Sequence, residues 1–248
     1  MAGLAMGYPM PQARGGNPDT STLYDINGLA KDAPGWLDHT MKFVGEYGIV
    51  LGLAVLMVFA WWSLRRRPDA PAAVAALLWA PLAAGLALLV NVPIRGFVKR
   101  PRPFIDHTGL EVLVKGKTDY SFVSDHATLT MAIGVALFVA NRKYGLIGIG
   151  LAFLEGFCRV YMGVHYPTDV IGGLALGTAV ALLLAPLAMM ALTPLTRAVS
   201  RTRCAWLVRA DGPVAAPPPL VAAEAAGAAG AAEAERGVPR HRDNDLAA

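Results

Sequence analysis

Charged residues are scarce in this sequence. Only 16% of the 248 residues are Asp, Glu, Lys or Arg, whereas 55% are hydrophobic, and the mean hydropathy is +0.45. A soluble domain usually contains about 25% charged residues, so this composition does not favour a soluble globular protein. It indicates a protein embedded in a membrane.

Cysteines and clustered acidic side chains are also scarce. Cys158 and Cys204 lie in segments that we expect at different depths, without metal-ligand spacing, so we predict neither a disulfide nor a metal site for them. The carboxylates are too few and too scattered for a two-metal catalytic site, and the sequence implies no metal and no other cofactor. The first twenty residues lack the pattern of a cleavable signal peptide, so the first membrane helix is expected to direct insertion.

Long apolar segments are abundant, and a membrane helix needs about 20 of such residues. They predict an all-α integral membrane protein, a bundle of five to six transmembrane helices preceded by an interfacial amphipathic helix. The five expected spans are Glu46–Leu64, Ala72–Ile94, Ser124–Asn141, Tyr144–Phe157 and Val170–Thr196.

Composition divides the chain into four parts. Residues 1–21 are expected to be a disordered N-terminus, and residues 22–45 an interfacial amphipathic segment broken at Pro34 and Gly35. Residues 46–196 would form the transmembrane domain, and residues 197–248 a basic and then Ala/Pro-rich disordered tail.

Basic clusters follow the first, third and fifth expected spans, which places them on one side of the membrane. By the positive-inside rule that side is the cytoplasm, so the tail is predicted to be cytoplasmic in a multi-pass protein of the cell membrane. The opposing loops are almost as basic, and the assignment holds only if some of their cations are kept to bind an anion. The clusters are Arg65–Arg67, Arg142 with Lys143, and Arg197, Arg201, Arg203 and Arg209.

Three groups of polar residues are expected to meet on the opposite, extracytoplasmic side. The first is VPIRGFVKRPRPF, residues 92–104, in which Arg95 and Arg102 are seven positions apart. Guanidinium groups match phosphate oxygens, so converging arginines would hold a phosphoryl group. The alternative is a basic cluster that lies among anionic lipid headgroups.

The second group is YSFVSDHATLT, residues 120–130. Ser124 or Asp125 would cap the third span, and His126 follows at a helix start, where the backbone N–H groups favour an anion. A histidine there can act as an acid near neutral pH, although a lone histidine is more often structural.

The third group is CRVYMGVHYPTDV, residues 158–170. Asp169 follows His165 by four residues, close enough to hold one ring nitrogen and leave the other as a nucleophile. Glu155 precedes Arg159 by the helical spacing of an ion pair, so we predict that it orients Arg159. Alternatively, Asp169 only complements the helix dipole.

Together these residues resemble the type 2 phosphatidic acid phosphatase superfamily, over roughly residues 46–196. Arg95, six residues and Arg102-Pro103 correspond to its first motif, residues 123–126 (Val-Ser-Asp-His) to its second, and Arg159, His165 and Asp169 to its third. Val123 and Asp125 replace the Pro and Gly that are common in the second motif. The Ser-Asp-His variant with RPRPF is similar to the bacterial undecaprenyl-diphosphate phosphatase branch.

The resemblance implies removal of the terminal phosphate of a polyprenyl diphosphate through a phosphohistidine. It implies a catalytic group of His165 as nucleophile, Asp169 as its orienting carboxylate and His126 as acid and then base. The implied phosphate-binding residues are Arg95, Arg102, Arg159, Ser124 and Asp125, with Lys99 as a candidate for the second phosphate.

Several alternatives remain open at this point. Within the enzyme class, the substrate could be phosphatidate or phosphatidylglycerophosphate. Outside it, the chain could be a non-catalytic, phospholipid-binding membrane scaffold, whereas a transporter is disfavoured because the charges gather at one face. The expected partners are the lipid bilayer and a lipid phosphate, with no nucleic acid, and a homo-oligomer is left open.

Overall fold

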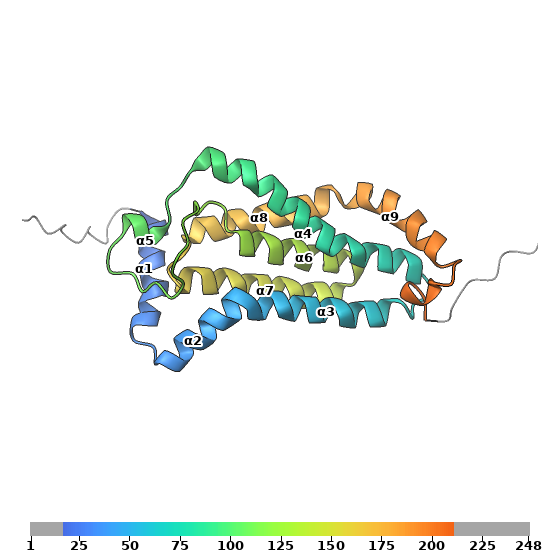
Figure 1. The fold of residues 1–248 in the computed structure, drawn as a ribbon, viewed down its shortest axis with the longest axis horizontal. Coiled ribbons are helices and arrows are strands. Elements are labelled where there is room, and N and C mark those ends of the chain that lie inside the picture. Colours follow the sequence, from blue (N-terminus) through green and yellow to red (C-terminus); the bar gives the residue numbers. More distant parts are fainter. Residues whose placement is uncertain (1–16, 211–248) are drawn as a thin grey trace, which may run out of the picture.

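The computed structural model describes residues 17–210, and every regular element in that range is helical (Figure 1). The predicted all-α class is confirmed. The helices are α1 (Pro18–Lys31), α2 (Gly35–Phe43), α3 (Ile49–Leu64), α4 (Ala70–Val98), α5 (Pro103–Asp106), α6 (Asp125–Ala140), α7 (Arg142–Tyr161), α8 (Pro167–Leu183) and α9 (Ala185–Val199), with a π-helical turn at Val44–Gly48 and a 3-10 turn at Ala205–Leu207.

Three helical stretches within residues 17–210 are long and apolar enough to cross a membrane. They are Gly35–Leu64, Ala70–Asp106 and Arg142–Tyr161, and the bent pair of α8 and α9 would make a fourth. The expected third span corresponds to α6, which has only 16 residues and is buried among its neighbours. The chain is therefore a multi-pass membrane protein, with a helix in the place of each expected span.

The last expected span is not one straight helix. Between α8 and α9 the chain bends by 51°, whereas Val170–Thr196 was expected to be continuous. Pro186 lies in the first turn of α9, and it has no N–H to donate to the preceding turn. A proline at this position breaks the hydrogen-bond ladder, which accounts for the bend.

The N-terminal boundaries also differ from the expectation. Helix α1 begins at Pro18, inside the segment expected to be disordered, because Asn17 caps it by accepting from the N–H of Asp19 at 3.0 Å. The break falls at residues 32–34, and α2 then runs without interruption into α3. The second half of the expected interfacial segment is thus the start of the first long helix. Residues 1–16 lie outside the described range.

The first residues of the expected tail are ordered. The N–H of Ala210 donates to the carbonyl of Arg65 at 2.8 Å, and the indole N–H of Trp61 donates to the carbonyl of Leu207 at 2.7 Å. These bonds fix residues 197–210 against the end of α3, and the disorder predicted for residues 211–248 concerns residues outside the described range. Cys204 is exposed at this end, Cys158 is buried in α7, and both are free.

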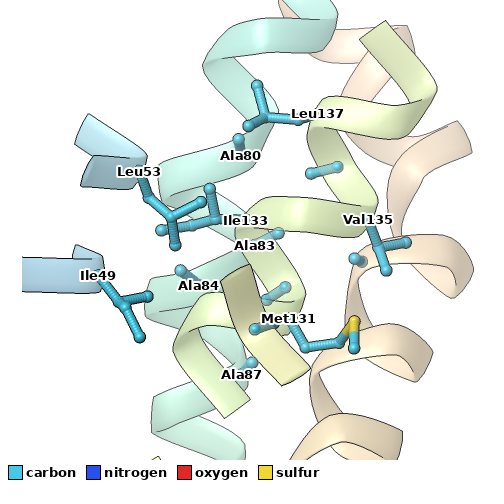
Figure 2. Close-up of a cluster of buried hydrophobic side chains, with 14 of the residues drawn as sticks. Ile49, Leu53, Ala80, Ala83, Ala84, Ala87, Met131, Ile133, Val135 and Leu137 are labelled. Carbon is cyan, nitrogen blue, oxygen red and sulfur yellow. The ribbon is translucent and has the colours of Figure 1, made fainter. Parts of the chain in front are cut away.

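Helix α6 is the centre of the bundle and packs against α4, α7 and α8. Figure 2 shows the side of α6 that carries Ile133 and Leu137 facing the small side chains Ala80, Ala83 and Ala84 of α4. Alanines on one face of α4 let the two helices approach closely, as is common between membrane helices.

Two glycine contacts bring α6 still closer to its other neighbours. Gly134 of α6 faces Gly148 of α7, and a Cβ on either one would lie within 3 Å of the other helix's backbone. Gly177 of α8 is in similar contact with the backbone of α6, where a Cβ would lie 2.4 Å from the carbonyl oxygen of Thr128. This packing fixes the starts of α6 and α8 relative to each other.

Candidate active site

Backbone contacts join the three predicted motifs at one end of the bundle. The Arg102 guanidinium, before α5, donates to the carbonyl of Val164 at 2.9 Å. The N–H of Ser124, at the start of α6, donates to the carbonyl of Asp169, in the first turn of α8, at 3.1 Å. Motifs that are up to 74 residues apart in the sequence thus form one site, at the end of the bundle where α1 and α5 lie (Figure 1).

His165 is almost fully buried, with 5% of its surface exposed, and lies between a carboxylate and a guanidinium. Its Nδ1 is 3.6 Å from Oδ2 of Asp169, and its Nε2 is 3.3 Å from a guanidinium nitrogen of Arg102. Arginine can only donate, so Nε2 is an acceptor and Nδ1 carries the proton that faces Asp169. This tautomer leaves the lone pair of Nε2 on the side of Arg102.

Burial lowers the pKa of His165, and the neighbouring cation Arg102 lowers it further. The nearby carboxylate of Asp169 works in the opposite direction but does not outweigh the burial. The imidazole is therefore neutral at pH 7, which is the form that a nucleophile needs.

Arg95 and Arg102 converge on the same anion, the carboxylate of Asp119. Arg102 donates to Oδ1 of Asp119 through two nitrogens, at 2.8 and 3.2 Å, and Arg95 donates to Oδ2 at 3.1 Å. Partial burial acts to raise the pKa of Asp119, but the bonds from Arg102 outweigh it and keep the pKa below its usual value. Asp119 is thus an anion held where two predicted phosphate ligands meet.

Arg159 is buried with 1% of its surface exposed, and each of its guanidinium nitrogens is paired. Nε donates to Glu155 at 2.6 Å, Nη1 donates to Glu46 at 2.6 Å, and Nη2 donates to the carbonyl of Gly45. The Glu155–Arg159 contact is the one that we predicted. Binding of phosphate by Arg159 stays a prediction, and it requires Glu46 to move.

The start of α6 carries three predicted site residues with different surroundings. The carboxylate of Asp125 pairs with Arg95 and accepts from the amide of Asn91 at 2.7 Å, so it orients Arg95. The hydroxyl of Ser124 is fully buried and has no hydrogen-bond partner within residues 17–210. Its free hydroxyl and the imidazole of His126 are available to a ligand.

The two lysines near the site, Lys99 and Lys117, have different surroundings. Lys99 ends α4 in a left-handed conformation and is exposed, without an ion pair in the described part of the chain. Lys117 lies 3.7 Å from Glu46, beside the predicted site. Within residues 17–210, no group of three or more His, Cys, Asp or Glu is arranged to hold a metal ion.

Four residues of this network were missed by the sequence analysis: Asp19, Glu46, Arg100 and Asp119. Glu46 carried a signal, because a lone carboxylate at the start of an apolar span usually has a partner. Arg100 is one of several basic residues in its loop, and the sequence does not set it apart from them. Asp19 and Asp119 are in segments without periodicity, and nothing in the sequence identifies their partners.

A cavity of about 690 Å³ opens next to these residues, between α3, α4 and α6. Glu46, Arg95, Asp125 and His126 line one part of it. On α4, Leu88 precedes Arg95 by seven residues, which is about 10 Å along a helix. The part of the lining that lies away from Arg95 is apolar. The other lining residues are Tyr47, Val50, Leu51, Ala54, Leu88, Val92 and Leu129. The cavity therefore suits an amphiphile with an anionic head and an apolar chain.

The sequence is similar to those of known proteins. A sequence model of the PAP2 superfamily matches residues 73–192, which include all three motifs. Undecaprenyl-diphosphatase BcrC of Bacillus subtilis is 34% identical over 148 residues, covering 59% of this chain and 72% of the relative. The chain belongs to the PAP2 superfamily, and it is a hydrolase that acts on phosphate esters of membrane lipids.

One further relative and one solved structure are also similar to this chain. Decaprenylphosphoryl-5-phosphoribose phosphatase of Mycobacterium tuberculosis is 31% identical over 166 residues, covering 65% of this chain and 86% of the relative. The crystal structure of Aquifex aeolicus LpxE has a TM-score of 0.51 at 22% identity, and the match covers 66% of this chain and 92% of that one. At this identity the second match shows the shared fold alone.

Proposed function

We propose that this protein removes the terminal phosphate of a polyprenyl diphosphate, undecaprenyl diphosphate in the first place, through a phosphohistidine at His165. The observation that carries the proposal is the geometry of His165. It is buried and neutral, with Asp169 beside Nδ1 and Arg102 beside Nε2. The product, undecaprenyl phosphate, would return to use as a lipid carrier in cell-wall synthesis.

In the first step, Nε2 of His165 attacks the terminal phosphorus. A P–N bond forms and the P–O bond to the bridging oxygen breaks. Arg102 exchanges its contact with Nε2 for one with a phosphate oxygen, and Arg95 binds a second oxygen. His126 protonates the leaving oxygen, since an anionic diphosphate beside its imidazole favours the protonated form.

In the second step, water cleaves the phosphohistidine. His126, now neutral, takes a proton from the attacking water, the P–N bond breaks and inorganic phosphate leaves. Asp169 stabilises the positive charge that His165 gains in the first step and keeps until the P–N bond breaks in the second, as the carboxylate of a catalytic triad does. In this scheme each bond change and each proton transfer is assigned to a named side chain of the protein.

Two observations support a long lipid diphosphate. The apolar part of the cavity lies between α3 and α4 and would receive the chain, while Arg95 and His126 lie where the head would be. The relative in Bacillus subtilis is named for this activity. A second candidate is a sugar phosphate monoester carried on a polyprenylphosphoryl lipid, such as the decaprenylphosphoryl-5-phosphoribose in the name of the mycobacterial relative, which matches over a larger share of its length.

We further propose that the site faces the extracytoplasmic side and the C-terminus the cytoplasm. Arg65–Arg67 and the end of α9 lie at the opposite end of the bundle from α1 and α5 (Figure 1). An impermeant maleimide on intact cells tests this. It should label a Lys115→Cys variant but should label the native Cys204 only after permeabilisation, and the reverse pattern would contradict the orientation.

The activity is tested by phosphate release from purified protein in detergent, with a chelator present throughout. Undecaprenyl diphosphate, decaprenylphosphoryl-5-phosphoribose and phosphatidate are compared for the wild type and for His165→Ala. His39→Ala is the matched control, because His39 is exposed and bonds only to the carbonyl of Gly35 in its own helix. The proposal is supported if the wild type and His39→Ala release phosphate and His165→Ala does not. The lipid that is hydrolysed fastest then decides between the two candidate substrates. Equal release by His165→Ala contradicts the proposal.

A further inference from the structure

Helix α1 is packed on the end of the bundle that holds the candidate site. Its Leu23 and Asn27 are fully buried. The Asn27 amide donates to the carbonyls of Tyr161 and Glu111, both at 2.8 Å, and accepts from the N–H of Glu111 at 2.8 Å. These bonds attach α1 to the end of α7 and to the link before α6, so its position relative to the site is fixed.

The first turn of α1 places one carboxylate at the start of α8. Asp19 accepts from the N–H of Thr168 at 2.8 Å, from the Thr168 hydroxyl at 2.6 Å and from Arg100 at 2.6 Å. Only 8% of its side chain is exposed. Partial burial acts to raise the pKa of Asp19, but these bonds keep it below the usual value, so Asp19 is ionised at neutral pH.

Arg100 connects this carboxylate to the predicted catalytic dyad. Its Nη2 binds Asp19, while its Nη1 donates to Oδ1 of Asp169 at 2.9 Å and to the Thr168 hydroxyl at 2.7 Å. The guanidinium lies 3.6 Å above the ring of Tyr166, which fixes its plane. Arg100 is therefore held on one face by the Tyr166 ring and at both ends of its fork by Asp19 and Asp169.

We propose that Arg100, held by Asp19, is a positioning residue for the Asp169 carboxylate, which makes helix α1 a working part of the active site. This inference rests on the proposed function of His165 and Asp169. Oδ1 of Asp169 binds Arg100, and Oδ2 accepts from the N–H of Tyr166 at 2.9 Å. With both oxygens fixed, the carboxylate keeps Oδ2 on the Nδ1 side of His165.

Arg100 also acts on the charge of the dyad. The Arg100 guanidinium beside Asp169 partly neutralises this carboxylate, so the carboxylate stabilises a protonated His165 less and the neutral imidazole is favoured. Removing Arg100 should therefore make His165 easier to protonate. The other charged or titratable groups near His165 are Asp169 on α8, Arg102 and Asp119 on the links around α5, Arg159 on α7, and Asp125 and His126 on α6.

The test compares Arg100→Gln, Arg100→Lys and Asp19→Asn with the wild type in the phosphate-release assay. Asp25→Asn is the matched control, because Asp25 is exposed on the same helix six residues later. For Arg100→Gln we expect kcat to fall about tenfold or more, the scale of one hydrogen bond to a charged group, while KM changes less than about twofold. Arg100→Lys should recover part of the loss, and Asp25→Asn should behave as the wild type.

The pH profile of kcat/KM distinguishes a positioning role from a purely structural one, because a loss of folded protein lowers the rate without shifting the profile. In Arg100→Gln its acid limb should shift to higher pH, because protonation of His165 becomes easier. If Arg100→Gln has the same kcat as the wild type and its acid limb is not shifted, the inference is overturned while the proposed function stays in place. No release by the wild type from any lipid would overturn the proposed function itself, and the inference with it.

Discussion

Arginines lie at both ends of this bundle, and the two ends use them differently. At the end with the candidate site, Arg100, Arg102 and Arg159 are partly or fully buried and bind carboxylates. At the other end, Arg65 and Arg66 lie on the rings of the partly buried Trp61 and the exposed Trp62. Cations beside tryptophans are typical of a membrane interface, whereas buried cations need anionic partners, which carboxylates supply at the site end.

This difference explains why counting charges on the sequence almost fails to orient the chain. The positive-inside rule assumes that basic loop residues are free to interact with the membrane surface. The arginines of the site end are used inside the protein and should not be counted. The comparison also predicts that substitutions at the two ends have effects of very different size.

The largest expected effect is that of Arg102→Lys. Lysine keeps the charge but cannot make the paired bonds that Arg102 makes to one carboxylate, and it would bind a phosphate as a point charge. We expect kcat/KM to fall about 10²- to 10³-fold, as for the loss of one preorganised donor to the transition state.

The matched variant at the other end is Arg66→Lys, and for it we expect kcat/KM to stay within about twofold of the wild type, because its exposed contact with Trp62 contributes little. Steady-state phosphate release measures both variants. Equal losses at the two ends would show that the site-end arginines have no special role.

The next effect in size is that of His126→Ala, and it should depend on the leaving group. A phosphomonoester loses an alkoxide, which needs a proton in the transition state, whereas a diphosphate loses a phosphate, which needs it less. We expect a loss of about 10²- to 10⁴-fold for the monoester and a clearly smaller loss for the diphosphate.

Both substrates pass through the same phosphohistidine in this account. The ratio of the two losses therefore reports on the first step alone, and rapid-quench kinetics with each lipid measures it. Identical losses for the two substrates would remove His126 from the role of acid.

A smaller effect, of opposite sign, is expected for Asp119→Asn. Asp119 occupies Arg95 and Arg102, so a substrate phosphate has to displace it. Removing its charge should lower KM and the inhibition constant of orthovanadate about twofold to fivefold, the scale of a half-exposed ion pair.

The control for this variant is Glu111→Gln, on the same link and exposed. A higher KM in Asp119→Asn would mean that Asp119 positions the arginines and does not compete with the substrate.

The smallest effect concerns stability and pH. Burial keeps the pKa of His165 in the folded protein below its value in the unfolded chain, about 6.5. The unfolded state therefore takes up a proton first, and this contribution to stability is present above pH 6.5 and is lost as the pH falls. Between pH 7.5 and 5, the thermal midpoint of the wild type should fall more than that of His165→Asn. A parallel fall in both proteins would contradict a neutral, buried His165.

The sequence was sufficient for the helical class and for the meeting of the three motifs, because these depend on apolar length and on residue spacing. It was insufficient for the bend at Leu184, although Pro186 marks it, since a long apolar run conceals a break. It was also insufficient for Asp19, whose partner Thr168 is 149 residues away. A contact of this kind depends on tertiary packing, and local patterns do not encode it.

The most direct test of the central claim is to trap the covalent intermediate. Purified protein is mixed with undecaprenyl diphosphate labelled in the terminal phosphate, quenched in alkali to preserve a phosphoramidate, digested and sequenced by mass spectrometry. The account predicts phosphate on His165 in the wild type and none in His165→Asn, with more of it in His126→Ala, where water is no longer activated. Turnover without label on His165, or label on another residue, would contradict the account.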